Sequence, residues 1–145
     1  MPRIERNADI VWEGNVARGN GTITPATGAF PELPFTLASR IAAPEGKTSP
    51  EELLASAHGA CFTMSLANEL VQAGTPPGRL EINCRIVMDE VSGQGHQIVG
   101  SVLQVRADVE GADDAALDAA IAKADEGCPF SALLKRAGAD VQVSR

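Results

Sequence analysis

Cysteine and basic residues are scarce in this sequence, and each scarcity argues against a class of protein. The three cysteines, Cys61, Cys84 and Cys128, are widely spaced over 145 residues, unlike the denser, even sets of small secreted proteins held together by disulfides. Lysine and arginine total 12 against 19 acidic residues, which gives a net charge of -7. An acidic chain without a basic cluster repels phosphate backbones, so we expect no nucleic-acid partner.

Long hydrophobic runs are also missing. No stretch reaches the roughly 18 consecutive apolar residues of a membrane-spanning helix. The first residues, MPRIERNADIV, carry charges but no apolar core of a secretion signal. We therefore expect a cytoplasmic protein with no membrane partner.

The composition that remains is that of an ordinary folded domain. Hydrophobic residues make up 44% of the chain and charged residues 21%, which is enough apolar material for a core and argues against disorder. The sequence has no internal repeat or linker, so its length predicts one domain over residues 1–145.

The order of local patterns predicts an α+β fold. Alternating apolar and polar residues and turn signals predict strands at 9–14, 17–24, 80–91, 96–109 and 139–144, with a proline-containing, irregular strand over 28–41. Asn20-Gly21 is a dipeptide typical of a tight turn with positive φ. Helical patterns cover 50–73, 113–127 and 128–138. Strands, a long helix, two strands, two helices and a strand form an α+β arrangement.

The long helix at 50–73 has the clearest boundaries. Ser49 precedes Pro50 as a helix cap, Glu52 stands where a capping box has its acid, and Gly74 follows as the residue that ends the helix. Steps of three and four residues predict a buried face made of Leu54, Ala57, Cys61, Met64 and Ala67 or Asn68.

Cys61 lies in the middle of this helix among small and apolar residues. A buried structural cysteine is one interpretation, because free cysteine is among the most buried residue types. A reactive thiolate is the other, and it requires a nearby cation, because apolar burial raises the pKa of a thiol. Arg40 and Arg18 are the candidate cations, although each alone is also typical of a solvated surface charge.

The other two cysteines lie in different local settings. Cys128, between Gly127 and Pro129, opens a helix, where unpaired N–H groups favour a thiolate. It is equally typical of a residue in a helix-capping turn. Cys84 alternates onto the apolar face of a strand, which predicts a structural role.

His58 and Glu51 share the long helix with Cys61. His58, three residues earlier, is a candidate general base or metal ligand beside Cys61, but no further ligand pair completes a zinc site and no residue orients the ring. His96 lies in a turn without a partner. Glu51, ten residues before Cys61, lies about 15 Å from it along a helix. If both serve one site, a second chain brings its Glu51 near, or an arginine bridges a kink; alternatively Glu51 only complements the helix dipole.

Three segments together resemble the OsmC/Ohr family, which comprises the osmotically inducible protein C and the organic hydroperoxide resistance proteins. TSPEELLASAHGACFTMSL at 48–66 is similar to the central-helix signature of that family. WEGNVARGNGTIT at 12–24 and EGCPFSALLK at 126–135 match its other segments in order and spacing. The WEG, RG-x-GT and AH-x-ACF stretches resemble the OsmC branch more than the Ohr branch.

The resemblance implies antiparallel sheets around a long central helix, in an intertwined homodimer with active sites at the subunit interface. It implies a thiol-dependent peroxidase in which Cys61 is the peroxidatic cysteine and Cys128 the resolving one. It pairs Glu51 with an active-site arginine, with Arg40 the first choice for the OsmC branch and Arg18 the match to the Ohr branch.

The implied chemistry reduces an organic hydroperoxide, and more weakly hydrogen peroxide, through a sulfenic acid and a disulfide. We expect no cofactor or metal, but an external dithiol or lipoyl-type reductant must restore the thiols. The apolar side chains expected to favour organic substrates are Phe62, Met64, Phe130 and Phe30 of the partner subunit. Two alternatives remain open: a non-catalytic binding domain with structural cysteines, and a hydrolase that uses His58 with Cys61.

Overall fold

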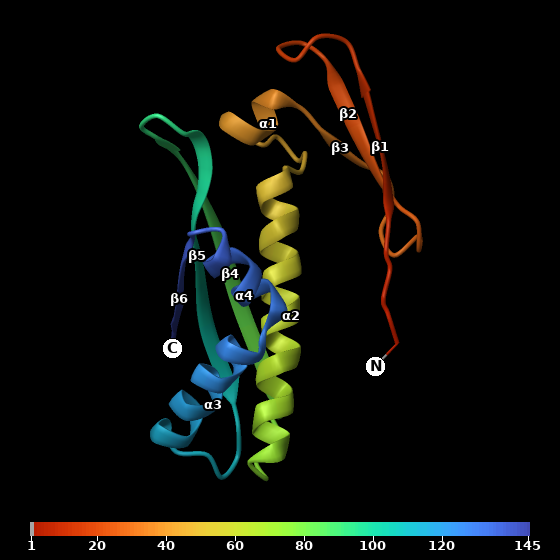
Figure 1. The fold of residues 1–145 in the computed structure, drawn as a ribbon. Helices are drawn as coiled ribbons and strands as arrows, with labels where there is room; N and C mark the ends of the chain where they lie inside the picture. The colour runs from red at the N-terminus through yellow and green to blue at the C-terminus, as the bar shows by residue number, and fades with distance from the viewer. Residues whose placement is uncertain (1) are drawn as a thin grey trace. The chain divides into compact units, whose positions relative to one another are not determined.

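The structure, a computed structural model, describes residues 2–145. The chain forms two compact units that divide between Leu53 and Leu54, and each is described by itself below (Figure 1). The first unit contains the strands β1, β2 and β3 and the short helix α1. The second contains β4, β5 and β6 with α3 and α4, together with most of the long helix α2.

The first unit is a small antiparallel sheet in which β1 (Ala8–Glu13), β2 (Asn20–Pro25) and β3 (Leu33–Phe35) lie in chain order. The turn between β1 and β2 begins at Gly14, with a φ of +88°, and the Asn15 side chain accepts the N–H groups of Ala17 and Arg18. The predicted turn at Asn20-Gly21 is wrong, because both residues belong to β2. Gly21 is instead a site of close approach, where a Cβ atom would lie 2.4 Å from the Phe35 ring.

The segment expected to form one irregular strand over 28–41 divides into β3 and a helix. Strand β3 has only three residues, and α1 (Leu37–Ile41) follows it. Thr36 and Ser39 form a reciprocal capping box at the start of α1, in which each side chain accepts the other's backbone N–H. This local pair of hydrogen bonds stabilises a helical turn over the extended chain.

The helix α2 (Pro50–Gln72) begins at the predicted residue and ends one residue before the predicted end. The Ser49 hydroxyl accepts the N–H of Glu52 at 3.2 Å, and Gly74 ends the helix with a φ of +79°. The buried face is different from the predicted one, because the larger side chains select it. It follows a step of four through His58, Phe62, Leu66 and Leu70, whereas the Met64 side chain is 68% exposed.

The second unit contains a sheet of β4 (Arg79–Val91), β5 (Gly95–Asp108) and β6 (Asp140–Ser144). Strands β4 and β5 form a long antiparallel hairpin with an irregularity between Val87 and Met88. Strands β5 and β6 are parallel, unlike the rest of the sheet, because α3 (Asp114–Gly127) and α4 (Pro129–Arg136) supply the crossover that a parallel pair needs.

The core of the second unit lies between α2, β5 and α3. Its completely buried members include Phe62 and Leu66 from α2, Leu103 from β5 and Ala124 from α3. The completely buried Cys128, between α3 and α4, belongs to the same cluster. The α+β class is therefore confirmed. Within residues 2–145, no helix combines the length and apolar character needed to cross a bilayer.

Candidate active site

Cys61 and Cys128 meet in the second unit. Cys61 is half-buried in the middle of α2, and Cys128 caps the start of α4. The two free thiols lie close enough to interact with each other, and the backbone N–H of Phe130, in the first turn of α4, is a further polar neighbour of the Cys61 sulfur. The fold thus brings together the two cysteines that the sequence resemblance pairs.

The surroundings of Cys61 favour the protonated thiol. Burial is the main cause that raises the pKa of the Cys61 thiol, and the hydrogen bond and charge interaction with Cys128 raise it further. The Phe130 N–H opposes this, because it stabilises a negative sulfur. The thiol pKa is raised on balance, so a reactive Cys61 needs an additional positive group.

A buried polar group lies beside this thiol pair, and we call its members, His58, Ser101, Ser131 and Cys84, the His58 cluster. His58 Nδ1 lies 2.7 Å from the Ser101 hydroxyl oxygen, and Nε2 lies 2.8 Å from that of Ser131. The histidine and both serines have no exposed surface. The Cys84 sulfur lies 3.5 Å from the Ser101 oxygen. The cluster therefore joins α2, β4, β5 and α4.

Burial favours the neutral form of the His58 imidazole. Burial lowers its pKa, the Asp125 carboxylate raises it in part, and the Lys135 ammonium lowers it. Both ring nitrogens bond to serine hydroxyls, which argues against His58 as the base of a Cys61 hydrolase. The pKa of Cys84 is raised by burial, against hydrogen bonds from Ser101 and from the backbone of Gly59.

Sequence reasoning missed the two serines of this cluster. Ser101 and Ser131 lie 43 and 73 residues from His58 along the chain, and no local pattern connects them. The available signal was the histidine itself, because a histidine on a buried helix face needs partners for both ring nitrogens.

In the first unit, Arg40 and Glu51 form an ion pair. Arg40 Nη2 lies 2.5 Å and Nε 2.9 Å from Glu51 Oε1, so the last turn of α1 is tied to the first turn of α2. The second carboxylate oxygen of Glu51 is buried, and no group within residues 2–145 hydrogen-bonds to it. Arg18, the alternative partner for Glu51, lies exposed in the turn between β1 and β2.

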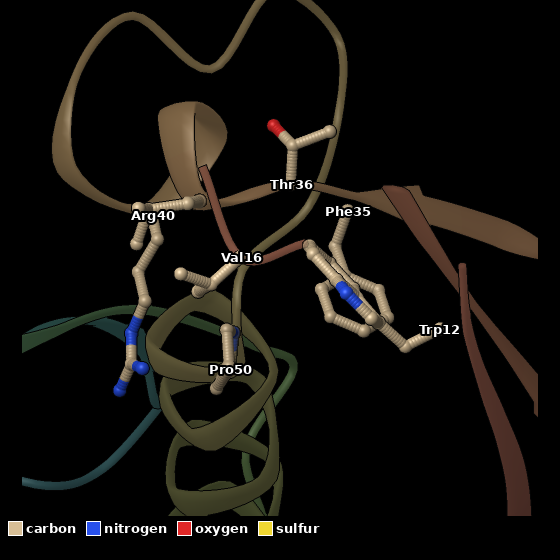
Figure 2. Close-up of a pocket in the computed structure, with 7 residues that line it drawn as sticks. Trp12, Val16, Phe35, Thr36, Arg40 and Pro50 are labelled. Carbon is tan, nitrogen blue, oxygen red and sulfur yellow. The ribbon is translucent and has the colours of Figure 1, made fainter. Parts of the chain in front are cut away.

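An apolar pocket of about 170 Å³ adjoins Arg40 in the first unit (Figure 2). The Trp12 and Phe35 rings form one wall, with their centroids 5.5 Å apart. Val16 lies over Pro50 in the close-up. The remaining lining residues are Thr36 and Leu37. A guanidinium beside an apolar wall suits a ligand that has both a polar group and a hydrocarbon part.

The four predicted substrate-binding residues lie in different environments. Phe62 is completely buried in the core, whereas Met64 is largely exposed on α2. Phe130 packs partly buried beside the core cluster at the start of α4. Phe30 lies between β2 and β3 and is 37% exposed. The Phe130 backbone N–H is a neighbour of the Cys61 sulfur.

Comparison with known proteins identifies the family of the chain. Residues 43–144 match the family model described as OsmC-like protein. The chain is 35% identical over 132 residues to a protein of Escherichia coli strain K12 named peroxiredoxin OsmC, with 91% of each chain covered.

Solved structures share the fold. The organic hydroperoxide resistance protein OhrB of Bacillus subtilis is 26% identical, with 95% of this chain and 96% of that one covered and a TM-score of 0.74. An OsmC-like protein of unknown function from Vibrio cholerae is 13% identical, with 98% and 99% covered and a TM-score of 0.79, which is a likeness of fold. This chain belongs to the OsmC-like protein family.

Proposed function

We propose that this protein is a thiol-dependent peroxidase that reduces organic hydroperoxides to alcohols. The observation that carries the proposal is the proximity of Cys61 and Cys128, two thiols from distant parts of the chain that meet at the start of α4. The names of the relatives, peroxiredoxin OsmC and organic hydroperoxide resistance protein, point to the same class of substrate.

The first step oxidises Cys61. Its thiolate attacks the terminal oxygen of the hydroperoxide, the O–O bond breaks, and the alkoxide that leaves takes a proton to become an alcohol. The sulfur retains one oxygen as a sulfenic acid. The Phe130 N–H, which donates to the Cys61 sulfur, stabilises the negative charge before the attack.

The second step joins the two cysteines. The Cys128 sulfur attacks the sulfenic sulfur of Cys61, an S–S bond forms, and the oxygen leaves as water after protonation. A dithiol or lipoyl-type reductant then returns both thiols by exchange and becomes a disulfide itself. The contact between the thiols in the reduced protein means that only a small displacement precedes this bond.

An arginine supplies the positive charge that Cys61 lacks within its own surroundings. Arg40 is the first choice, because its ion pair with Glu51 holds the guanidinium in one orientation. Arg18 is the alternative. Phe130, Met64 and Phe30 of the partner subunit are the proposed contacts for the hydrocarbon part of the substrate, and the apolar pocket beside Arg40 is a further candidate. Phe62 supports them from the core.

The active form is proposed to be an intertwined homodimer. The first unit buries a single apolar side chain among its described residues, Ile23, while Ile10, Val11 and Val16 are exposed on it. Such a sheet has too little core to be stable by itself, and a second copy of the chain would cover it. The cytoplasmic location stays a prediction.

Peroxide turnover by cysteine variants tests the proposal. With cumene hydroperoxide and a dithiol, Cys61→Ser should abolish turnover, while Cys128→Ser should give one oxidation per chain and stop at the sulfenic acid. Cys84→Ser is the matched control and should retain activity. Intact mass after one equivalent of peroxide should show a loss of about two hydrogens in the wild type.

The competing outcome is that of a binding domain with structural cysteines. Slow, stoichiometric oxidation of the wild type, equal in all three variants, would contradict a peroxidase.

A further inference from the structure

The start of α4 contains Cys128 and Phe130, the two neighbours of the Cys61 sulfur, but this helix end has no side-chain cap. Cys128 occupies the cap position and makes no side-chain capping hydrogen bond. Phe130, two residues later, supplies the N–H that reaches the Cys61 sulfur. An uncapped first turn tends to fray, and here fraying would separate both groups from the thiol.

The His58 cluster provides the missing attachment at this end of α4. Ser131 follows Phe130 directly, and its hydroxyl bonds to His58 Nε2 at 2.8 Å. His58 lies one turn before Cys61 on α2. The contacts therefore close a ring: from His58 to Ser131, along α4 to the Phe130 N–H, to the Cys61 sulfur, and back along α2. At the other end of α4, Lys135 is paired with Asp125 of α3.

We infer that His58 is a positioning residue for the thiol pair, which holds Cys128 and the Phe130 N–H against Cys61 through the Ser131 hydroxyl. This inference builds on the proposed function but concerns the reduced protein before any peroxide arrives. His58 does not touch the reacting sulfur atoms and acts on them only through its hydrogen bond to Ser131.

The second half of the cluster fixes the imidazole itself. A neutral imidazole donates through one nitrogen and accepts through the other, so one serine hydroxyl donates to His58 and the other accepts from it. The Ser101 hydroxyl, from β5, bonds Nδ1 at 2.7 Å and also contacts Cys84. Ser101 thus orients the ring from the sheet side, whereas Ser131 alone transmits that orientation to α4.

Two serine variants separate positioning from stability. Ser131→Ala and Ser101→Ala each remove one completely buried hydroxyl and one hydroxyl–imidazole hydrogen bond of His58, while the Cys84 sulfur stays 3.9 Å from Nδ1. Their costs in stability should therefore be similar. The readout is the alkylation rate of each cysteine in the fully reduced protein, assigned by peptide mass, together with the pH profile of Cys61 alkylation.

The two variants should each expose a different cysteine. Ser131→Ala should raise the alkylation rate of the buried Cys128 about tenfold, the equivalent of one lost hydrogen bond, and should raise the pKa of Cys61 further as the Phe130 contact weakens. Ser101→Ala should instead expose Cys84 and leave Cys128 protected. Ser131→Thr, which keeps a hydroxyl, should restore the protection of Cys128.

Equal changes at Cys128 in the two alanine variants, or none in either, would overturn the inference. A measurement on the unaltered protein covers the case in which Ser131→Ala does not fold. The Phe130 amide should exchange with deuterium as slowly as amides in the middle of α2, and exchange typical of a frayed helix end would equally overturn it.

The rate of disulfide formation after addition of peroxide distinguishes this inference from the proposed function. After one equivalent of cumene hydroperoxide, Ser131→Ala should form the Cys61–Cys128 disulfide more slowly than Ser101→Ala. If the wild type does not react with peroxide but the alkylation pattern holds, the proposed function fails and the positioning role of His58 stands.

Discussion

Cys61 is a thiol whose immediate neighbours mostly favour its protonated form. Burial and Cys128 raise its pKa, and the single opposing contact within the second unit is the Phe130 N–H. One backbone donor is a weaker influence than a full positive charge at the same distance. At the scale of the residue, the question is therefore which guanidinium completes the site.

The two arginines can be separated by substitution. Arg40→Ala should lower kcat/KM for cumene hydroperoxide at pH 7 by about tenfold or more, because an opposite charge changes a neighbouring pKa by roughly one to three units. The loss should shrink as the pH rises and Cys61 ionises without help. Arg18→Ala is the comparison and should have a smaller effect.

The pH profiles of turnover and of Cys61 alkylation check this prediction. If neither variant changes the two profiles, the requirement for an arginine is wrong. If Arg18→Ala has the larger effect, the site is of the Ohr type, and the Arg40–Glu51 pair is a connection between helices.

At the scale of elements, the His58 cluster joins a helix, two strands and a second helix through neutral polar groups. Such a connection is stable only while the imidazole is neutral, and burial likewise favours the protonated thiols of Cys61 and Cys84. Burial lowers the pKa of His58 from 6.5 and raises those of Cys61 and Cys84 from 9.0. The lowered pKa of His58 reduces stability at low pH, whereas the raised pKa values of the two thiols reduce it at high pH.

The free energy of unfolding should be greatest between about pH 6.5 and 9. Below 6.5 the unfolded chain binds a proton at His58 that the folded chain excludes, so stability falls as the pH falls, by at most about 1.4 kcal/mol per pH unit for one group. Above 9 the unfolded chain loses thiol protons that the folded chain retains, so stability falls as the pH rises.

Urea unfolding between pH 5.5 and 10 under reducing conditions measures this curve. The pH range near 6 lies above the usual titration of carboxylates, so a decline there reports on His58 rather than on acid groups. Constant or rising stability from pH 7 to 5.5 would show that the imidazole is not held neutral.

For the whole molecule, the two units differ in how well each buries apolar surface. The second unit has a continuous core of completely buried side chains. The first presents apolar side chains to solvent on a sheet of only three strands. A sheet of that size needs packing against another surface to be stable.

A second copy of the chain is the expected partner for the first unit. Sedimentation should give a mass of about twice 15.1 kDa. Ile10→Asp or Val11→Asp, in β1, should produce monomer, because a carboxylate would be buried against apolar surface. Ile4→Asp is the matched control, since Ile4 is 61% exposed and Ile10 60%, and Ile4 lies outside the strand. A wild-type monomer would contradict the homodimer.

Several elements could be predicted from local patterns because local forces decide them. Ser49 and Gly74 bound α2, since a capping hydroxyl and a residue with positive φ act on their own neighbours. Period-two alternation located β4 and β5. The face of α2 that is buried was predicted wrongly, because steps of three and four leave several faces open, and packing against Leu103 and Ala124 selects the one through Phe62.

The amino-acid sequence by itself determined which residue types were available for chemistry. These are a cysteine in the middle of a helix (Cys61), a second cysteine at the start of another helix (Cys128) and an acid in the first turn of the long helix (Glu51). Only the tertiary structure decided which of them meet. The Cys61–Cys128 contact, the Arg40–Glu51 pair and the His58 cluster all join residues with no local relation, because their energies depend on burial and approach that exist only once the chain has folded.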